Sequence, residues 1–125
     1  RTLSEESARV LRSRLLNPLW IEGLKRHGYR GAYDVAYNMD NVFGWDATAD
    51  SVLDWNYEAL ASHFLGDPSN REWLKSANPW ALYEIAQRLL EAAQRGMWQA
   101  KPETIEMITE IYLSSEGVLE EGASG

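Results

Sequence analysis

The sequence predicts a compact all-α domain of about six helices, and three observations support this prediction. Apolar residues recur at helical spacing along most of the 125-residue chain. Three of the four prolines follow a residue that caps helices well, and glycines follow the expected helix ends. The sequence contains no alternating strand pattern of four or more residues and no Asn-Gly hairpin turn. Short connections are therefore expected, with proline at helix starts and glycine at helix ends.

The N-terminal part of the chain predicts two helices, over residues 3–15 and about 18–27. The first is amphipathic and has acidic residues in its first turn, where the helix dipole favours anions. Asn17 is a good N-cap for the second, and Pro18 suits the first helical position because its missing N–H is not needed there. Gly28 is expected to end this helix in the left-handed conformation.

Two longer helices are expected in the middle of the chain, over about 31–43 and 51–65. Gly44 and Gly66 follow their last residues, and the segment between the two helices is rich in turn residues. The apolar residues expected to face the core are Ala32, Val35, Ala36, Met39, Val42 and Phe43 in the first, and Leu53, Tyr57, Leu60, Ala61 and Phe64 in the second.

Prolines mark three further helix starts in the C-terminal half. The expected helices cover 68–77, 79–95 and 102–119. Asp67 and Asn78 stand before the first two prolines as caps, whereas Lys101, before the third, is a poor cap. The residues expected to face inward are Trp73, Leu74, Leu82, Ile85, Ala86, Leu89, Leu90, Ala93, Ile105, Ile108, Ile111 and Tyr112.

The expected helices extend through residue 119 without an internal linker. Residues 1–119 are therefore predicted to form one helical domain, and residues 120–125 a disordered tail. The chain does not begin with Met, so we expect it to be a fragment or a processed piece of a larger protein.

Charge is unevenly distributed along the chain, whose net charge is −7. Residues 1–30 carry a net charge of +4, whereas residues 31–70 carry −7 and contain no Lys or Arg. A block of this length without basic side chains cannot neutralise phosphates, so a nucleic-acid partner is not expected. The absence of cysteine excludes disulfides and thiolate metal sites and fits a cytoplasmic protein. No run of about 18 apolar residues predicts a membrane span.

A basic turn, Lys25-Arg26-His27-Gly28-Tyr29-Arg30, is the strongest candidate binding site. Its cations would repel a metal ion, but they suit carboxylates of a substrate or partner. The alternative is a histidine that only packs at a helix end.

Two other groups of residues leave alternatives open. Asp46, Asp50, Asp54 and Glu58 are spaced four apart, so they are either loop and cap residues or a site for a divalent cation. The six tryptophans either pack in the core and at interfaces or form an aromatic wall for a flat macrocycle. The sequence contains no phosphate loop, no GxSxG and no HExxH motif, so nothing indicates that this chain catalyses a reaction alone.

Two segments of the chain resemble a known family. The segment NPLWIEGLKRHGYRGAYDVAYNMDNVFGWDAT, with Asp54-Trp55-Asn56-Tyr57-Glu58 after it, resembles the C-terminal end of the large subunit of tetrapyrrole metal chelatases. This is the family of the cobaltochelatase large subunit (CobN) and the magnesium chelatase H subunit. The segment from Asn78-Pro79-Trp80-Ala81-Leu82 to Gly96-Met97-Trp98 resembles the cobalt branch. The resemblance covers about residues 9–119.

The resemblance implies ATP-dependent insertion of Co²⁺ into a corrin-type ring, hydrogenobyrinic acid a,c-diamide, in cobalamin biosynthesis. The large subunit would hold the tetrapyrrole, and separate AAA+ and integrin-like subunits would hydrolyse Mg-ATP. This chain would be the helical end of that large subunit, joined to its remainder, with no catalytic residue or bound cofactor of its own and inactive in isolation. Its candidate substrate-binding residues would be Trp20, Lys25, Arg26, His27 and Tyr29, whose basic cluster suits carboxylate side chains of a tetrapyrrole. The alternatives are a magnesium chelatase H domain, serving Mg²⁺ insertion into protoporphyrin IX, and a non-enzymatic module that recruits the AAA+ subunits.

Overall fold

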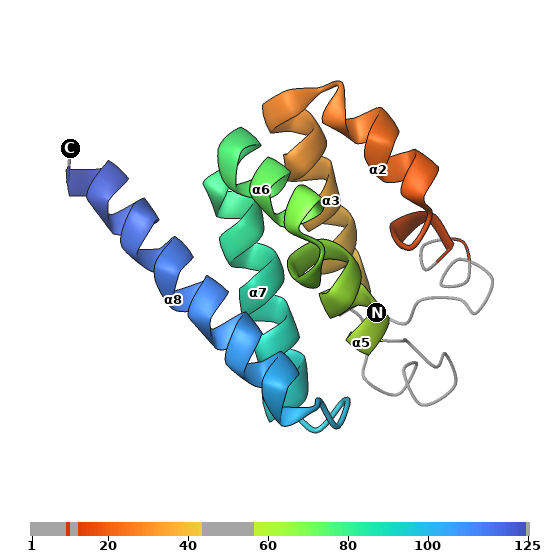
Figure 1. Ribbon diagram of the computed structural model, residues 1–125, viewed down its shortest axis with the longest axis vertical. Helices are drawn as coiled ribbons and strands as arrows, with labels where there is room; N and C mark the ends of the chain where they lie inside the picture. Colours follow the sequence, from red (N-terminus) through yellow and green to blue (C-terminus); the bar gives the residue numbers. More distant parts are fainter. Residues whose placement is uncertain (1–9, 11–12, 44–56, 125) are drawn as a thin grey trace.

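Every regular element that the structure describes is a helix, as the sequence predicted (Figure 1). The computed structural model describes residues 10, 13–43 and 57–124. The elements are α2 (Pro18–Lys25), α3 (Gly28–Phe43), α5 (Tyr57–Ala61), the π-helix η1 (Ser62–Gly66), α6 (Pro68–Ala77), α7 (Pro79–Gln94) and α8 (Pro102–Ser124). Most of the helix predicted over 3–15, and the first part of the one predicted over 51–65, lie outside the described residues.

Helix α7 is the centre of the packing, with α8 along one side and α3 and α6 along the other (Figure 1). It contacts α3, α5, α6 and α8. The residues that were predicted to face inward and are fully buried or nearly so are Ala32, Val35, Ala36, Met39, Tyr57, Leu60, Ala61, Phe64, Leu74, Leu82, Ile85, Ala86, Leu89 and Ile108. Burying each large aliphatic or aromatic side chain contributes about 1.5–3 kcal/mol, so these stripes hold the helices together.

The core also includes several residues that were not predicted to face inward. Ala81 and Ala92 of α7 are also buried, because a helix with neighbours on several sides buries more than one stripe. Ile21 and Leu65 join the same core. Leu90, by contrast, was predicted to face inward and is only partly buried at the edge of the core.

Two of the proline-marked helices are capped by the residue that the sequence predicted. The Asn17 side chain accepts a hydrogen bond from Leu19 N (2.9 Å) at the start of α2. The Asp67 side chain accepts from Ser69 N (2.8 Å) and Asn70 N (3.2 Å) at the start of α6. Each of these caps satisfies backbone N–H groups that the first turn cannot pair internally.

The start of α7 differs from the prediction, because Asn78 does not cap it with its side chain. Asn78 is buried, and its Nδ2 lies 3.4 Å from the backbone oxygen of Tyr29 in α3, to which it donates. A buried amide needs a partner, and the neighbouring helix supplies one. The side chain is therefore used between helices rather than within one.

The start of α8 is capped from a distant element. Glu58 of α5 accepts hydrogen bonds from Lys101 N (2.9 Å) and from the Thr104 hydroxyl (3.0 Å). A carboxylate at a helix N-terminus is favoured by the dipole and satisfies an otherwise unpaired N–H. Glu58 therefore supplies the cap that the sequence around Lys101 lacks.

The helix predicted to continue to residue 65 changes form in its last turn. Residues Ser62–Gly66 form the π-helix η1, in which Asp67 N donates to Ser62 O at 2.9 Å. Side chains of α6 satisfy two further carbonyls of η1: Asn70 Nδ2 donates to His63 O and Arg71 Nη1 to Leu65 O, both at 2.8 Å. Contacts with α6 thus support a wide turn that local propensity does not favour.

Two helix ends also differ from the sequence-based expectation. Helix α3 begins at Gly28, three residues before the expected start, and α8 continues to Ser124. Most of the segment predicted as a disordered tail is therefore the last turn of α8. No helix within the described ranges is long and apolar enough to cross a membrane.

Candidate functional site

The basic turn is held in place by close backbone contact between α2 and α3. Gly28 has φ +51°, the left-handed conformation that was predicted for it. His27 N donates to Leu24 O (2.9 Å), and a Cβ built on Gly31 would lie only 1.9 Å from that same oxygen. Gly31 is thus required for this approach, because any side chain there would strike the backbone of α2.

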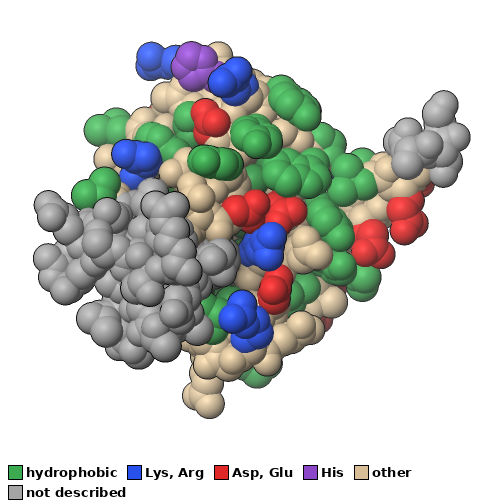
Figure 2. Space-filling view, turned by 180° about the vertical axis from the view of Figure 1, so that it is seen from behind, with side chains coloured by type: hydrophobic (Ala, Val, Ile, Leu, Met, Phe, Trp, Pro, Cys, Tyr) green, Lys and Arg blue, Asp and Glu red, His purple; other side chains and the backbone are tan. Residues whose placement is uncertain are grey.

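The turn presents three basic side chains to solvent at one end of the molecule. Arg26, His27 and Arg30 are exposed, and 68% of the Tyr29 surface is accessible. Figure 2 shows basic side chains and a histidine together at this end. The turn also leads into the N-terminus of α3, whose first N–H groups and dipole attract anions. Cations and helix dipole therefore favour the same kind of ligand, a carboxylate or another anion.

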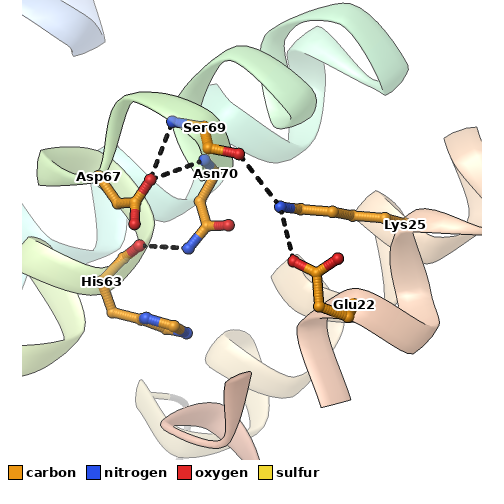
Figure 3. A network of polar contacts seen from close by, with 6 residues as sticks. All are labelled: Glu22, Lys25, His63, Asp67, Ser69 and Asn70. Atoms are coloured by element: carbon orange, nitrogen blue, oxygen red, sulfur yellow. Dashed lines mark hydrogen bonds and ion pairs between the residues drawn. The ribbon is translucent and has the colours of Figure 1, made fainter. Parts of the chain in front are cut away.

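Two of the five candidate residues do not face outward with this group. Trp20 is partly buried and packs against the core. Lys25 forms an ion pair with Glu22 Oε1 (3.1 Å) and donates to Ser69 Oγ of α6 (3.4 Å), as Figure 3 shows. The structure therefore brings Arg26, His27 and Tyr29 together on the exposed turn, while Lys25 links α2 to α6.

The second histidine lies near this link, on the π-helix η1 (Figure 3). Burial lowers the pKa of His63; the Asp67 carboxylate opposes this effect, and the Lys25 ammonium adds to it. Among the described residues, no group of three or more His, Cys, Asp or Glu side chains is arranged to hold a metal ion. The His63 ring packs against Phe64, with the two ring centroids 4.8 Å apart.

Three of the four carboxylates in the predicted row, Asp46, Asp50 and Asp54, lie outside the described residues. Glu58 is used at the start of α8, where it binds the backbone and Thr104. Glu58 thus caps a different helix from the one that contains it, a role that its spacing in the row did not indicate.

A charged cluster that the sequence did not indicate lies at the other end of α3. Arg88 of α7 contacts Asp40 Oδ1 (3.1 Å), Glu84 Oε1 (2.9 Å) and Glu91 Oε2 (3.3 Å). Burial raises the pKa of Asp40 to about 6; the Glu84 carboxylate also raises it, and Arg88 lowers it. The four-residue spacing of Glu84 and Arg88 was a local signal for part of this cluster. The contact with Asp40 joins residues 48 apart and required the fold.

The geometry can bind an anion, but it contains none of the usual catalytic arrangements. The exposed turn has cations and a helix N-terminus, and no nucleophile–base pair lies among its residues. Its cations and the N-terminus of α3 suit anionic groups such as carboxylates.

Comparisons with known proteins identify relatives across most of the chain. The CobN/Magnesium Chelatase family model matches residues 1–105. The aerobic cobaltochelatase subunit CobN of Pseudomonas aeruginosa is 43% identical over 116 residues, which are 93% of this chain and 9% of that protein. The magnesium-chelatase H subunit of Chlorobaculum parvum is 44% identical over 118 residues, or 94% of this chain and 9% of that protein.

A solved structure has the same fold. The catalytic subunit of cobaltochelatase from Mycobacterium tuberculosis matches with a TM-score of 0.82 and 49% identity, over 94% of this chain and 10% of that one. The chain thus spans about a tenth of the length of these relatives. Cobalt and magnesium relatives are almost equally similar, so identity does not separate the two metals.

Proposed function

Because this chain belongs to the CobN/magnesium chelatase family, we propose that it is the C-terminal helical domain of a large, tetrapyrrole-binding chelatase subunit. In this role its basic turn binds carboxylate side chains of the tetrapyrrole. The observation that carries the proposal is the exposed group of Arg26, His27 and Arg30 at the N-terminus of α3. The acidic side chains of a tetrapyrrole are anions that such a site attracts.

We assign the reaction of the whole complex to insertion of Co²⁺ into a corrin-type ring in cobalamin biosynthesis. The support is the segment beginning Asn78-Pro79-Trp80, which resembles the cobalt branch. Insertion of Mg²⁺ into protoporphyrin IX is the alternative. AAA+ and integrin-like subunits would provide ATP hydrolysis in either case.

Titration of the full-length large subunit with tetrapyrrole, followed by tryptophan fluorescence, tests the basic turn. Arg26→Ala and His27→Ala should each weaken binding, for Arg26 about tenfold, because a charge-assisted hydrogen bond contributes about 1.5 kcal/mol. The melting temperature should stay unchanged, because both side chains are exposed. Arg95→Ala is a matched control: it removes an exposed cation next to Gly96, the glycine with positive φ in the α7–α8 turn.

Unchanged ring affinity in both variants would remove the basic turn from the binding site. Metal specificity needs a separate measurement, since the basic turn does not contact the metal. Insertion assays with the full-length large subunit, its ATPase partners, both metals and both rings would distinguish the cobalt from the magnesium assignment.

The acidic cluster favours a second candidate function, recruitment of the ATPase subunits. Asp40, Glu84 and Glu91 surround a single guanidinium, and the Glu91 side chain is 44% exposed. The excess of negative charge suits a basic partner surface. Loss of ATPase-subunit binding by a full-length Glu91→Lys variant would support this function, whereas unchanged binding would contradict it.

A further inference from the structure

Three tyrosines form an exposed stripe along α3 that neither candidate function uses fully. Tyr29, Tyr33 and Tyr37 are four residues apart, so they share one face of the helix. Their accessible fractions are 68%, 43% and 54%. Large aromatic side chains are more often buried than this, which makes three on one helix face informative.

The stripe is held rigid by a ring stack that extends into α7. The centroids of Tyr33 and Tyr37 are 6.2 Å apart with planes 19° apart, and those of Tyr33 and Trp80 are 5.6 Å apart with planes 24° apart. Trp80 is partly buried against the core and anchors the stack. A pre-ordered aromatic surface loses little side-chain entropy when a partner covers it, which is typical of strong interface contacts.

The stack has a defined place on the surface. We call Tyr29, Tyr33, Tyr37 and Trp80 the tyrosine face; apolar side chains lie between the basic end and the charged cluster in Figure 2. Half-exposed rings of this size leave roughly 300 Å² accessible, an area at which apolar patches begin to mark interaction sites. The other large exposed apolar residues of the described chain are Val10, Leu19, Leu113 and Val118.

We propose that the tyrosine face packs against the remaining polypeptide of the large chelatase subunit. This inference rests on the proposed function, in which the chain is one domain of such a subunit. About nine-tenths of each relative's length lies outside the match and is available as the occupant. A tethered segment needs less contact area than a free protein partner does, because its effective concentration is high.

Oxidative footprinting of the full-length large subunit tests this assignment, with mass spectrometry measuring the modification rate of each tyrosine. If the face is covered, Tyr33 and Tyr37 should be modified as slowly as the buried Tyr57, which is 4% exposed. For Tyr37 this is a rate more than roughly tenfold slower than its 54% exposure implies, as expected when a half-exposed side chain enters an interface core. Rapid modification of both tyrosines would overturn the proposal.

The same measurement after addition of the ATPase subunits distinguishes another occupant. Protection that appears only in their presence would assign the face to them and overturn the intramolecular contact. Tyr37→Arg in the full-length large subunit should speed the modification of Tyr33 severalfold, whereas Tyr37→Phe should leave it slow. An unchanged rate of Tyr33 modification in Tyr37→Arg would contradict the contact. If that variant does not fold, the modification rates in the protein without substitutions decide the question.

The proposals for the tyrosine face and for the basic turn can be rejected independently of each other. Protected tyrosines together with unchanged ring affinity in Arg26→Ala would retain the interface and reject the ring contact. Freely modified tyrosines together with weakened ring binding in Arg26→Ala would do the reverse.

Discussion

The two ends of α3 carry opposite charge, and they differ in how that charge is compensated. At the start, Arg26 and Arg30 are exposed, and neither forms an ion pair with another described residue. At the end, Asp40 contacts Arg88, which also holds two glutamates of α7. Arg30 and Asp40 are both unfavourable for α3, because the helix dipole prefers anions at the start and cations at the end, whereas Arg26 is also the C-cap of α2, where a cation is favoured.

This difference separates a binding surface from a structural contact. The negative charge near the end of α3 is partly offset by Arg88, and this contact joins α3 to α7. Arg30 has no such compensation among the described residues, and its charge destabilises the start of α3 by about 0.3–1 kcal/mol. A charge that costs stability fits a role in binding a ligand.

Gly31→Ala should have the largest effect, because it tests whether the start of α3 is fixed by contact with α2. The added Cβ would lie 1.9 Å from Leu24 O and 2.8 Å from Leu24 C, so the two backbones must separate. We expect a loss of about 3 kcal/mol or more in the free energy of unfolding, measured in urea.

The matched control is Gly23→Ala, in the middle of α2. A Cβ there meets nothing within 4 Å, and replacing a helical glycine by alanine stabilises by up to about 1 kcal/mol. Similar losses in the two variants would show that contact between α2 and α3 does not explain the effect.

Arg88→Ala tests the opposite end and should have the next largest effect. It leaves Asp40, Glu84 and Glu91 together without their shared cation. We expect a loss of about 1–3 kcal/mol, below the value for a fully buried pair because the Arg88 side chain is 36% exposed. Thermal and urea unfolding measure it, with exposed Arg95→Ala expected within about 0.5 kcal/mol of the parent. Equal losses would remove the special role of the cluster.

Asp40→Asn should change the pH dependence of stability. The pKa of Asp40 rises from 3.8 to about 6 on folding, chiefly because of burial. Between these values the folded protein keeps a proton that the unfolded chain releases, so the Asp40 contribution to stability falls as pH rises and levels off above about 6. The variant should lose this contribution, so the stability difference between variant and parent should grow in favour of the variant from about pH 4 to 7. A pH-independent difference would contradict the raised pKa.

Arg30→Glu should have the smallest effect on stability, and its sign distinguishes the two ends. Replacing a cation by an anion in the first turn of α3 should raise the free energy of unfolding by about 0.5–1 kcal/mol. The same change should weaken tetrapyrrole binding by the full-length large subunit. Lower stability would indicate that Arg30 has a structural partner and would weaken the comparison drawn above.

The sequence predicted the basic turn more completely than its surroundings. Arg26, His27 and Tyr29 lie together because Gly28 provides a left-handed residue between two helices, a local signal. It did not show that Lys25 would be engaged by Glu22 and Ser69, because Ser69 belongs to α6. The tyrosine spacing was visible, but its stack on Trp80 depends on how α7 packs on α3.

Sequence alone determined where α2, α6, α7 and α8 begin, because each starts at a proline, whose preference for the first helical position acts through neighbouring residues. Tertiary structure decided which polar groups meet. Glu58 caps α8 from 43 residues away, Asn78 binds Tyr29 O from 49 residues away, and Asp40 reaches Arg88 across 48 residues. Such partners are selected by packing around α7, since a hydrogen bond forms only after the core has brought its two atoms together.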